Sequence, residues 1–300
     1  MLNFINKALQ ISEFLFLTVF IKLIHWFKFY SLVYGIIIMG LICDCRELKS
    51  AFEKREVGAA SFALGNATVA LDQYLFASYY NPAALPTEKK FQMAFSLQNY
   101  FGIGGLNAID LTTNFNLAQN PVSLAINRFG NQNYQEIQVT AATRYDLIRD
   151  CAIGISVQCY ILSIWNYGRD MAWGLNFSVL YKVLSDLSIG AMVTNINKPV
   201  ISSVHENLPQ TMNVGFCYIP VPDIMILFEI FQDNRFSPAF RAGFSYQVIS
   251  RLTIRAGIED QTNMHCYGLG INMPWINFDY ALRNHPDLGV SHIITFSIVL

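Results

Sequence analysis

The segment from Met171 to Leu184 reads MAWGLNFSVLYKVL, and its pattern decides the fold class. Every second residue, beginning with the first, is large and apolar. Small or polar residues such as Gly174, Asn176 and Lys182 occupy positions in between. A period of two places alternate side chains on opposite faces of a β-strand. The segment is therefore predicted to be a strand with one apolar and one polar face.

The same alternation recurs along the chain, for example in residues 107–117 and 136–147. It predicts about fourteen strands, many of which have the ~9–11 residues that a tilted strand needs to cross a bilayer. The even number suits a closed antiparallel barrel. The predicted strands are 91–100, 106–117, 121–129, 134–147, 151–164, 171–184, 187–195, 211–219, 223–232, 238–248, 251–259, 265–273, 275–283 and 291–300.

The connections between these segments alternate in length. Short turns are predicted near 120–121, 148–150, 185–186, 220–222, 249–250 and 273–274, and longer links near 130–133, 165–170, 196–210, 232–237, 260–264 and 284–290. An outer-membrane barrel has tight turns at one end and external loops at the other. This pattern favours a transmembrane barrel over a soluble β-sandwich, which alternation alone would also allow.

The composition agrees with this interpretation. The chain has 300 residues, of which 53% are hydrophobic and 14% charged, against about 25% charged in an average soluble protein. The high hydrophobic content excludes a disordered chain. Lys and Arg number 20 and Asp and Glu 21, so no basic excess exists to bind nucleic acid.

The N-terminus has the features of an export signal. An apolar run of roughly 14 residues covers 29–42 and follows Lys22 and Lys28, which fits the apolar core of a secretory signal. The alternative is a membrane anchor over 11–42, which would bury both lysines. We predict an export segment at 1–45, a small-residue-rich segment at 46–90, and a barrel at 91–300.

Several motifs resemble those of PorV/PorQ-type outer-membrane proteins, which are relatives of the FadL-like transporters of hydrophobic compounds. They are Val57-Gly58-Ala59-Ala60, the stretch ALGNATVALD at 63–72, Asn81-Pro82-Ala83-Ala84-Leu85, Arg128-Phe129-Gly130, residues 195–199 with 208–210, 255–257, and 279–282 with 285–289. Ala84 stands where the family usually has glycine. The resemblance implies a fourteen-stranded barrel in the bacterial outer membrane. It further implies a role in type IX protein secretion or in the movement of apolar small molecules.

Two groups of residues are candidate functional sites. The resemblance implies that the segment 46–90 forms an internal hatch, or a first strand with an inward loop at Asn81-Pro82. Its gating candidates are Gly58, Gly65, Asn81 and Pro82; the alternative is that Asn-Pro and the glycines only form turns. The polar-face residues predicted to line the lumen are Asp110, Glu136, Arg144, Lys182, Glu229, Arg241, Arg255, Glu259, Asp279 and Arg283. These could form a polar pathway for a substrate or ion pairs that stabilise the barrel.

Enzyme signatures are missing from the sequence. It has no Gly-x-Ser-x-Gly, no Walker loop, and no His or Cys at metal-binding spacing. We therefore expect no catalytic activity, metal or cofactor. The expected partners are outer-membrane lipid and, because the chain ends in an alternating strand, the barrel-assembly machinery. The expected function is transport or secretion across the outer membrane. The alternatives are a scaffold barrel whose loop 196–210 binds a partner, and a secreted soluble β protein.

Overall fold

The computed structural model describes residues 51–53, 56–88, 91–118, 120–201, 206–261 and 263–300, all within the compact unit Arg46–Leu300. The predicted export segment at 1–45 lies outside the described residues. None of the described helices is long and apolar enough to span a bilayer.

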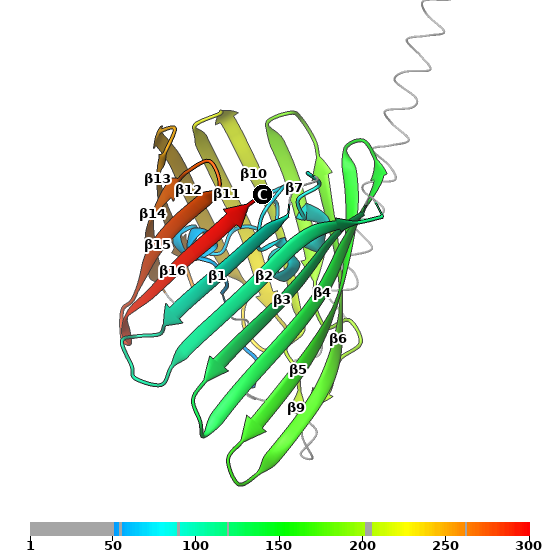
Figure 1. The fold of residues 1–300 in the computed structure, drawn as a ribbon, viewed down its shortest axis with the longest axis vertical. Coiled ribbons are helices and arrows are strands. Elements are labelled where there is room, and N and C mark those ends of the chain that lie inside the picture. The colour runs from blue at the N-terminus through cyan, green and yellow to red at the C-terminus, as the bar shows by residue number, and fades with distance from the viewer. Residues whose placement is uncertain (1–50, 54–55, 89–90, 119, 202–205, 262) are drawn as a thin grey trace, which may run out of the picture. The chain divides into compact units, whose positions relative to one another are not determined.

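Fourteen antiparallel strands close into a barrel, as predicted, and each strand pairs with its sequence neighbour (Figure 1). The barrel is closed by β1 and β16, from Gln92 opposite Val299 to Asn99 opposite His292. The strands are β1 (Gln92–Asn99), β2 (Asn107–Leu117), β3 (Asn120–Gly130), β4 (Tyr134–Ile148), β5 (Cys151–Ile164), β6 (Gly168–Lys182), β7 (Leu187–Val193), β10 (Thr211–Val221), β11 (Ile224–Asp233), β12 (Ala239–Ile249), β13 (Leu252–Glu259), β14 (Met264–Asn272), β15 (Ile276–His285) and β16 (Gly289–Val299).

One connection carries its own secondary structure. Between β7 and β10, a two-stranded ribbon pairs β8 (Val200–Ile201) with β9 (Glu206–Asn207). We call the barrel end that carries this connection the loop end. The opposite end, where β4 joins β5 and β6 joins β7, is the turn end. Tight turns mark the periplasmic side of outer-membrane barrels.

The two faces of the strands separate as the alternation predicts. In β2, Ala108, Asp110 and Thr112 are buried, whereas Ile109 and Leu111 are exposed. The other strands likewise expose large apolar side chains on the outer face. A soluble protein rarely exposes so continuous an apolar surface, but lipid accommodates it.

The predicted contrast in connection length holds only in part. The connection 194–210 is long, but residues 131–133, 165–167 and 286–288 form links as short as the tight turns. The reason is that several strands continue into sequence predicted as loop: β3 ends at Gly130, β6 begins at Gly168, and β15 and β16 reach His285 and Gly289. Arg169 and Asp170, for example, pair with Ser163 and Leu162.

Candidate functional site

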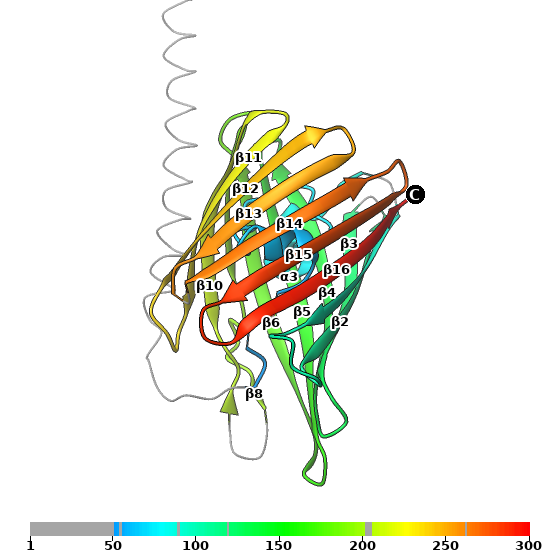
Figure 2. The ribbon, with the colours of Figure 1, turned by 90° about the vertical axis from the view of Figure 1, so that its left-hand side faces the viewer.

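The barrel interior is occupied by residues 56–88, which we call the inner segment. It contains the helices α2 (Ala59–Ala63) and α3 (Ala77–Tyr80) and the 3-10 turn η1 (Pro82–Ala84). Helix α2 contacts β13 to β16 and η1 contacts β4 to β6, so the segment crosses from one side of the wall to the other. Figure 2 shows α3 enclosed by the strands. Most residues of the segment are buried, with small side chains such as Ala63 and Ala83 fully so.

Glycines of the wall allow this close approach. At Gly243 a Cβ atom would lie 2.7 Å from the carbonyl oxygen of Leu64, and at Gly257 it would collide with the backbone of Gly65. Glycine inside a strand often marks such an approach of another backbone. We call the inward-facing residues that contact the segment in this way the glycine seat: Gly154, Gly190, Gly215, Gly243, Gly257 and Gly268.

Polar side chains of the wall satisfy backbone groups of the inner segment. Glu229 accepts a hydrogen bond from Val69 N at 3.0 Å, and Thr295 accepts one from Ala59 N at 2.9 Å. The hydroxyl of Ser178 accepts a bond from Ala83 N at 3.0 Å. An irregular segment has few partners of its own for these groups, so the wall supplies them.

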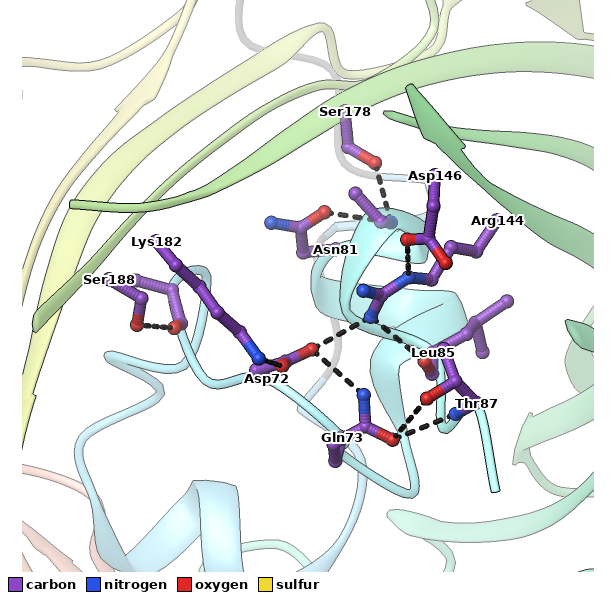
Figure 3. A network of polar contacts seen from close by, with 12 residues as sticks. Asp72, Gln73, Asn81, Leu85, Thr87, Arg144, Asp146, Ser178, Lys182 and Ser188 are labelled. Atoms are coloured by element: carbon purple, nitrogen blue, oxygen red, sulfur yellow. Dashed lines mark hydrogen bonds and ion pairs between the residues drawn. The ribbon is translucent and has the colours of Figure 1, made fainter. Parts of the chain in front are cut away.

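A cluster of ion pairs lies near the turn end, at what we call the Asp72 latch: Asp72, Arg144, Asp146 and Lys182 (Figure 3). The Asp72 carboxylate lies 2.8 Å from Arg144 Nη1 and 2.7 Å from Lys182 Nζ. Arg144 also contacts Asp146 at 2.8 Å and the Leu85 carbonyl oxygen at 3.2 Å. Burial by itself would raise the pKa of Asp72, but the two cations outweigh it and lower that pKa below its usual value.

A second ionic contact fixes the other part of the segment. Arg283 Nη1 donates to Glu56 at 2.6 Å, and its guanidinium lies 4.0 Å from the ring centre of Phe62 in α2. Burial opposes ionisation of Glu56, yet the charge of Arg283 prevails and lowers the pKa of this carboxyl. The inner segment thus has two charged anchors.

The four gating candidates all lie in the inner segment. Gly58 caps α2 with φ 84°, and Gly65 adopts φ 62°, which favours glycine. Asn81 donates to the carbonyl oxygens of Val69 and Val179, and Pro82 begins η1. Their positions join the segment to itself and to β6; the gating role stays a prediction.

The polar-face candidates point to the interior, and most form pairs. Arg241 contacts Glu259 at 2.6 Å and Glu229 at 3.5 Å. Arg255 contacts Asp279 at 2.6 Å. Besides these pairs and the two anchors, Glu136 accepts a bond from the Tyr134 hydroxyl at 2.6 Å. Asp110 contacts the amide of Asn127.

Two elements of the site were not predicted from the sequence. One is the partner role of Asp72 and Glu56, which come from outside the strands. The other is the glycine seat, for which a signal existed: these glycines fall on the polar face of alternating segments. Within the described ranges, no group of three or more His, Cys, Asp or Glu residues is placed to hold a metal ion.

Cavities border the inner segment toward both ends of the barrel. One, of about 250 Å³, is near the turn end, where Leu64, Leu71 and Tyr74 face Met225 and Arg255. Another, of about 50 Å³, lies toward the loop end beside Tyr79. The inner segment contributes to the walls of both.

No family model and no curated protein sequence matches the chain. Solved structures do. The Pseudomonas putida toluene transporter TodX has a TM-score of 0.61 at 11% identity, covering 83% of this chain and 99% of that one. The Ralstonia pickettii toluene transporter TbuX gives 0.59 at 13%, covering 83% and 98%. A Pseudomonas aeruginosa FadL homologue gives 0.54 at 10%, covering 80% and 97%. The chain therefore has the barrel fold of these FadL-type proteins.

Proposed function

We propose that this protein is a bacterial outer-membrane channel for hydrophobic small molecules, and that the inner segment must move before a molecule can pass. The observation that supports it most is the combination of a closed barrel, an apolar outer face and an interior occupied by residues 56–88. The structural neighbours TodX and TbuX are described as toluene transporters. The inner segment lines the cavities near both barrel ends, so a molecule that enters either cavity meets this segment.

Movement of the segment is physically reasonable because polar contacts hold much of it. A hydrogen bond that is exchanged for one to water costs only about 0.5–1.5 kcal/mol net, and Lys182 of the latch is exposed enough to return to water. Small side chains such as Ala63, Ala67 and Ala70 bury little surface, but Phe62, Tyr80 and Leu85 are also fully buried, so movement of the whole segment also exposes large apolar groups.

A reversible cross-link tests this proposal. A Cβ atom at Gly243 would lie 3.0 Å from Leu64 Cβ, somewhat closer than the roughly 3.5–4.5 Å between the Cβ atoms of a disulfide, so a small shift of the segment permits the bridge. In a background lacking the four described native cysteines, the Leu64→Cys/Gly243→Cys variant is reconstituted into liposomes, and uptake of radiolabelled toluene is measured. Oxidation should abolish uptake and reduction restore it. The single variants should be unaffected by either treatment. Equal uptake in both redox states would refute the proposal.

Location is tested separately. We expect the protein in the outer-membrane fraction, with heat-modifiable migration on SDS gels; release with soluble periplasmic proteins would contradict this. The PorV/PorQ assignment and a role with type IX secretion components remain predictions from the sequence motifs. Pull-down from detergent extracts, with a barrel of similar size as control, would test them.

A further inference from the structure

The cavity of about 250 Å³ near the turn end, which we call the turn-end cavity, is lined by two chemically different surfaces. The inner segment contributes an apolar surface made of Leu64, Leu71 and Tyr74, and Met225 of β11 packs beside the two leucines. The barrel wall is polar where β12 and β13 line the same space. A cavity with an apolar body and a few convergent polar groups is typical of a small-molecule site.

The polar side chains of β12 and β13 form one compact patch. Ser245 lies directly opposite Arg255, and Gln247 lies directly opposite Thr253 in the next inward-facing pair. The Cβ atoms of directly opposed residues are about 4.5–5.5 Å apart, and successive inward positions on one strand are about 7 Å apart. Met225 lies opposite Ser245 on the other side, so the apolar surface continues from the patch. One small molecule can therefore contact both surfaces at once.

The patch has unused hydrogen-bonding capacity. Ser245 is 6% exposed, and neither its hydroxyl nor the amide of Gln247 has a hydrogen-bond partner among the described residues. The Thr253 hydroxyl accepts a bond from Asn272 Nδ2 at 3.2 Å, which leaves its own proton to be donated. Polar groups that are this enclosed are costly unless a bound molecule or water pairs with them.

The charges around the cavity disfavour an anionic ligand. Arg255 is the one cationic residue among the described residues that line it, and its guanidinium is paired with Asp279 at 2.6 Å. Asp223, in the turn between β10 and β11, adds a further carboxylate. A carboxylate ligand would thus meet more negative than positive charge and gain no net attraction. A neutral ligand is not affected in this way.

We propose that the turn-end cavity binds a neutral molecule of about one aromatic ring that carries a hydroxyl group, such as a simple phenol. The ring lies against Leu64, Leu71 and Met225, and the hydroxyl bonds to Ser245 and Gln247. A cavity of about 150 Å³ holds benzene, so this one has room for a ring with a short substituent. The site rests on the proposed function, in which a molecule that passes the inner segment reaches this cavity.

Equilibrium dialysis of radiolabelled p-cresol against the purified protein in detergent tests the site, with protein-free micelles as the blank. Toluene and p-toluate are the unlabelled competitors at neutral pH, where the phenol is neutral and the carboxylate is ionised. We expect one saturable site for p-cresol. Toluene lacks the hydroxyl and should compete roughly 2- to 12-fold more weakly, which corresponds to one lost hydrogen bond. The p-toluate anion should not compete at concentrations at which toluene does.

Three variants assign the binding to this cavity. Ser245→Ala should bind p-cresol roughly 2- to 12-fold more weakly, because one hydroxyl is lost and the apolar surface is kept. The matched control is Ser123→Ala: Ser123 is also a buried inward serine whose hydroxyl has no partner among the described residues, but it lies on β3 and does not line this cavity. It should bind like the unmodified protein. Ser245→Leu fills the cavity and should abolish binding, while heat-modifiable migration checks that the barrel is intact.

Several results would overturn the proposal: no saturable binding above the micelle blank, competition by p-toluate equal to that by p-cresol, or unchanged affinity in Ser245→Ala or Ser245→Leu. Dialysis requires no passage through the barrel, so its failure can be told apart from failure of the proposed channel. Absence of binding together with redox-dependent toluene uptake in the cross-linked variant would remove the site alone. Binding together with equal uptake in both redox states would remove the channel alone.

Discussion

Replacing Asp72 by Asn should loosen the inner segment without unfolding the barrel. The change removes the negative charge that lies between Arg144 and Lys182, at 2.8 and 2.7 Å. The free-energy cost of the substitution depends on how buried the two ion pairs are that Arg144 and Lys182 lose. Breaking a fully buried ion pair costs about 3–5 kcal/mol, whereas an exposed pair contributes about 0.2–1 kcal/mol.

The cost of breaking the ion pairs of the Asp72 latch lies between these two values. The side chain of Asp72 is 14% exposed and that of Arg144 8%, but Lys182 is 47% exposed and can return to water. Arg144 keeps Asp146 and the Leu85 carbonyl oxygen, so it is not left unpaired. We therefore expect a cost of about 1–3 kcal/mol to the docked state of the segment, below the cost of a fully buried pair.

A native thiol reports this change. Cys217 on β10 is 2% exposed and packs beneath Leu64, Val69 and Ala70 of the inner segment. If a polar thiol reagent reaches it only when the segment undocks, the labelling rate follows the undocked population. The Asp72→Asn variant should be labelled roughly 5- to 150-fold faster, which corresponds to the estimated cost. Cys151 and Cys159 are replaced by Ser beforehand to simplify the readout.

The matched control is Asp146→Asn, which removes the more exposed partner of Arg144 and leaves the Asp72 contacts in place. It should change the labelling rate by less than about threefold. The reasoning fails if Asp72→Asn is labelled at the rate of the unmodified protein. It also fails if Asp146→Asn is labelled as fast as Asp72→Asn while heat-modifiable migration shows that both barrels are intact.

Other perturbations address the remaining contacts. Gly257→Val should displace the inner segment and speed labelling of the buried thiols, while Gly104→Val, where nothing lies within 4 Å, should not; equal rates would count against the glycine seat. Glu56→Gln should speed the labelling of Cys266, which lies directly opposite Arg283 in the β14–β15 pair, more than it speeds the labelling of Cys217. Because the pKa values of both anchoring carboxyls are lowered, their stabilisation is present above the unfolded-state pKa of about 4 and is lost as pH falls below it. Pepsin should therefore cleave the segment increasingly from pH 4 to 2, and cleavage independent of pH would contradict this. Ile254→Arg on the outer face should reduce refolding into lipid by up to about 2–4 kcal/mol, and an unchanged yield would argue against lipid contact.

The strands could be predicted from the sequence because a barrel repeats one local rule. Each side chain faces either lipid or the interior, so the alternation in residues 171–184 records its surroundings residue by residue. Strand ends were harder to place. At Gly168–Asp170 the residues are polar on both faces, since β5 and β6 extend to where lipid no longer selects apolar side chains.

The arrangement of the interior could not be predicted in the same way. The ion pair between Glu56 and Arg283 joins positions 227 residues apart, and that between Asp72 and Arg144 depends on how the segment enters the barrel. Lumen charges were visible as polar-face residues, but their partners follow from strand register and from a segment with no periodic pattern. Of the interior contacts, only the glycine seat has a local signal in the sequence, because its glycines fall on the polar face of the alternating segments.

The two anchors constrain how the segment can move. Its C-terminal part is close in sequence to the wall, because Leu85 precedes Gln92, the first residue of β1, by a stretch that can span at most about 25 Å. Helix α2 is not tied to the wall in this way, and noncovalent contacts to β13–β16, including the Glu56 pair, hold it. Release of the Glu56 anchor would therefore permit the larger displacement, whereas release of the Asp72 latch would let the segment shift locally near the turn end. An opening toward the turn-end cavity needs only the second motion, so thiol labelling of the Asp72→Asn variant measures the displacement that the proposed channel requires.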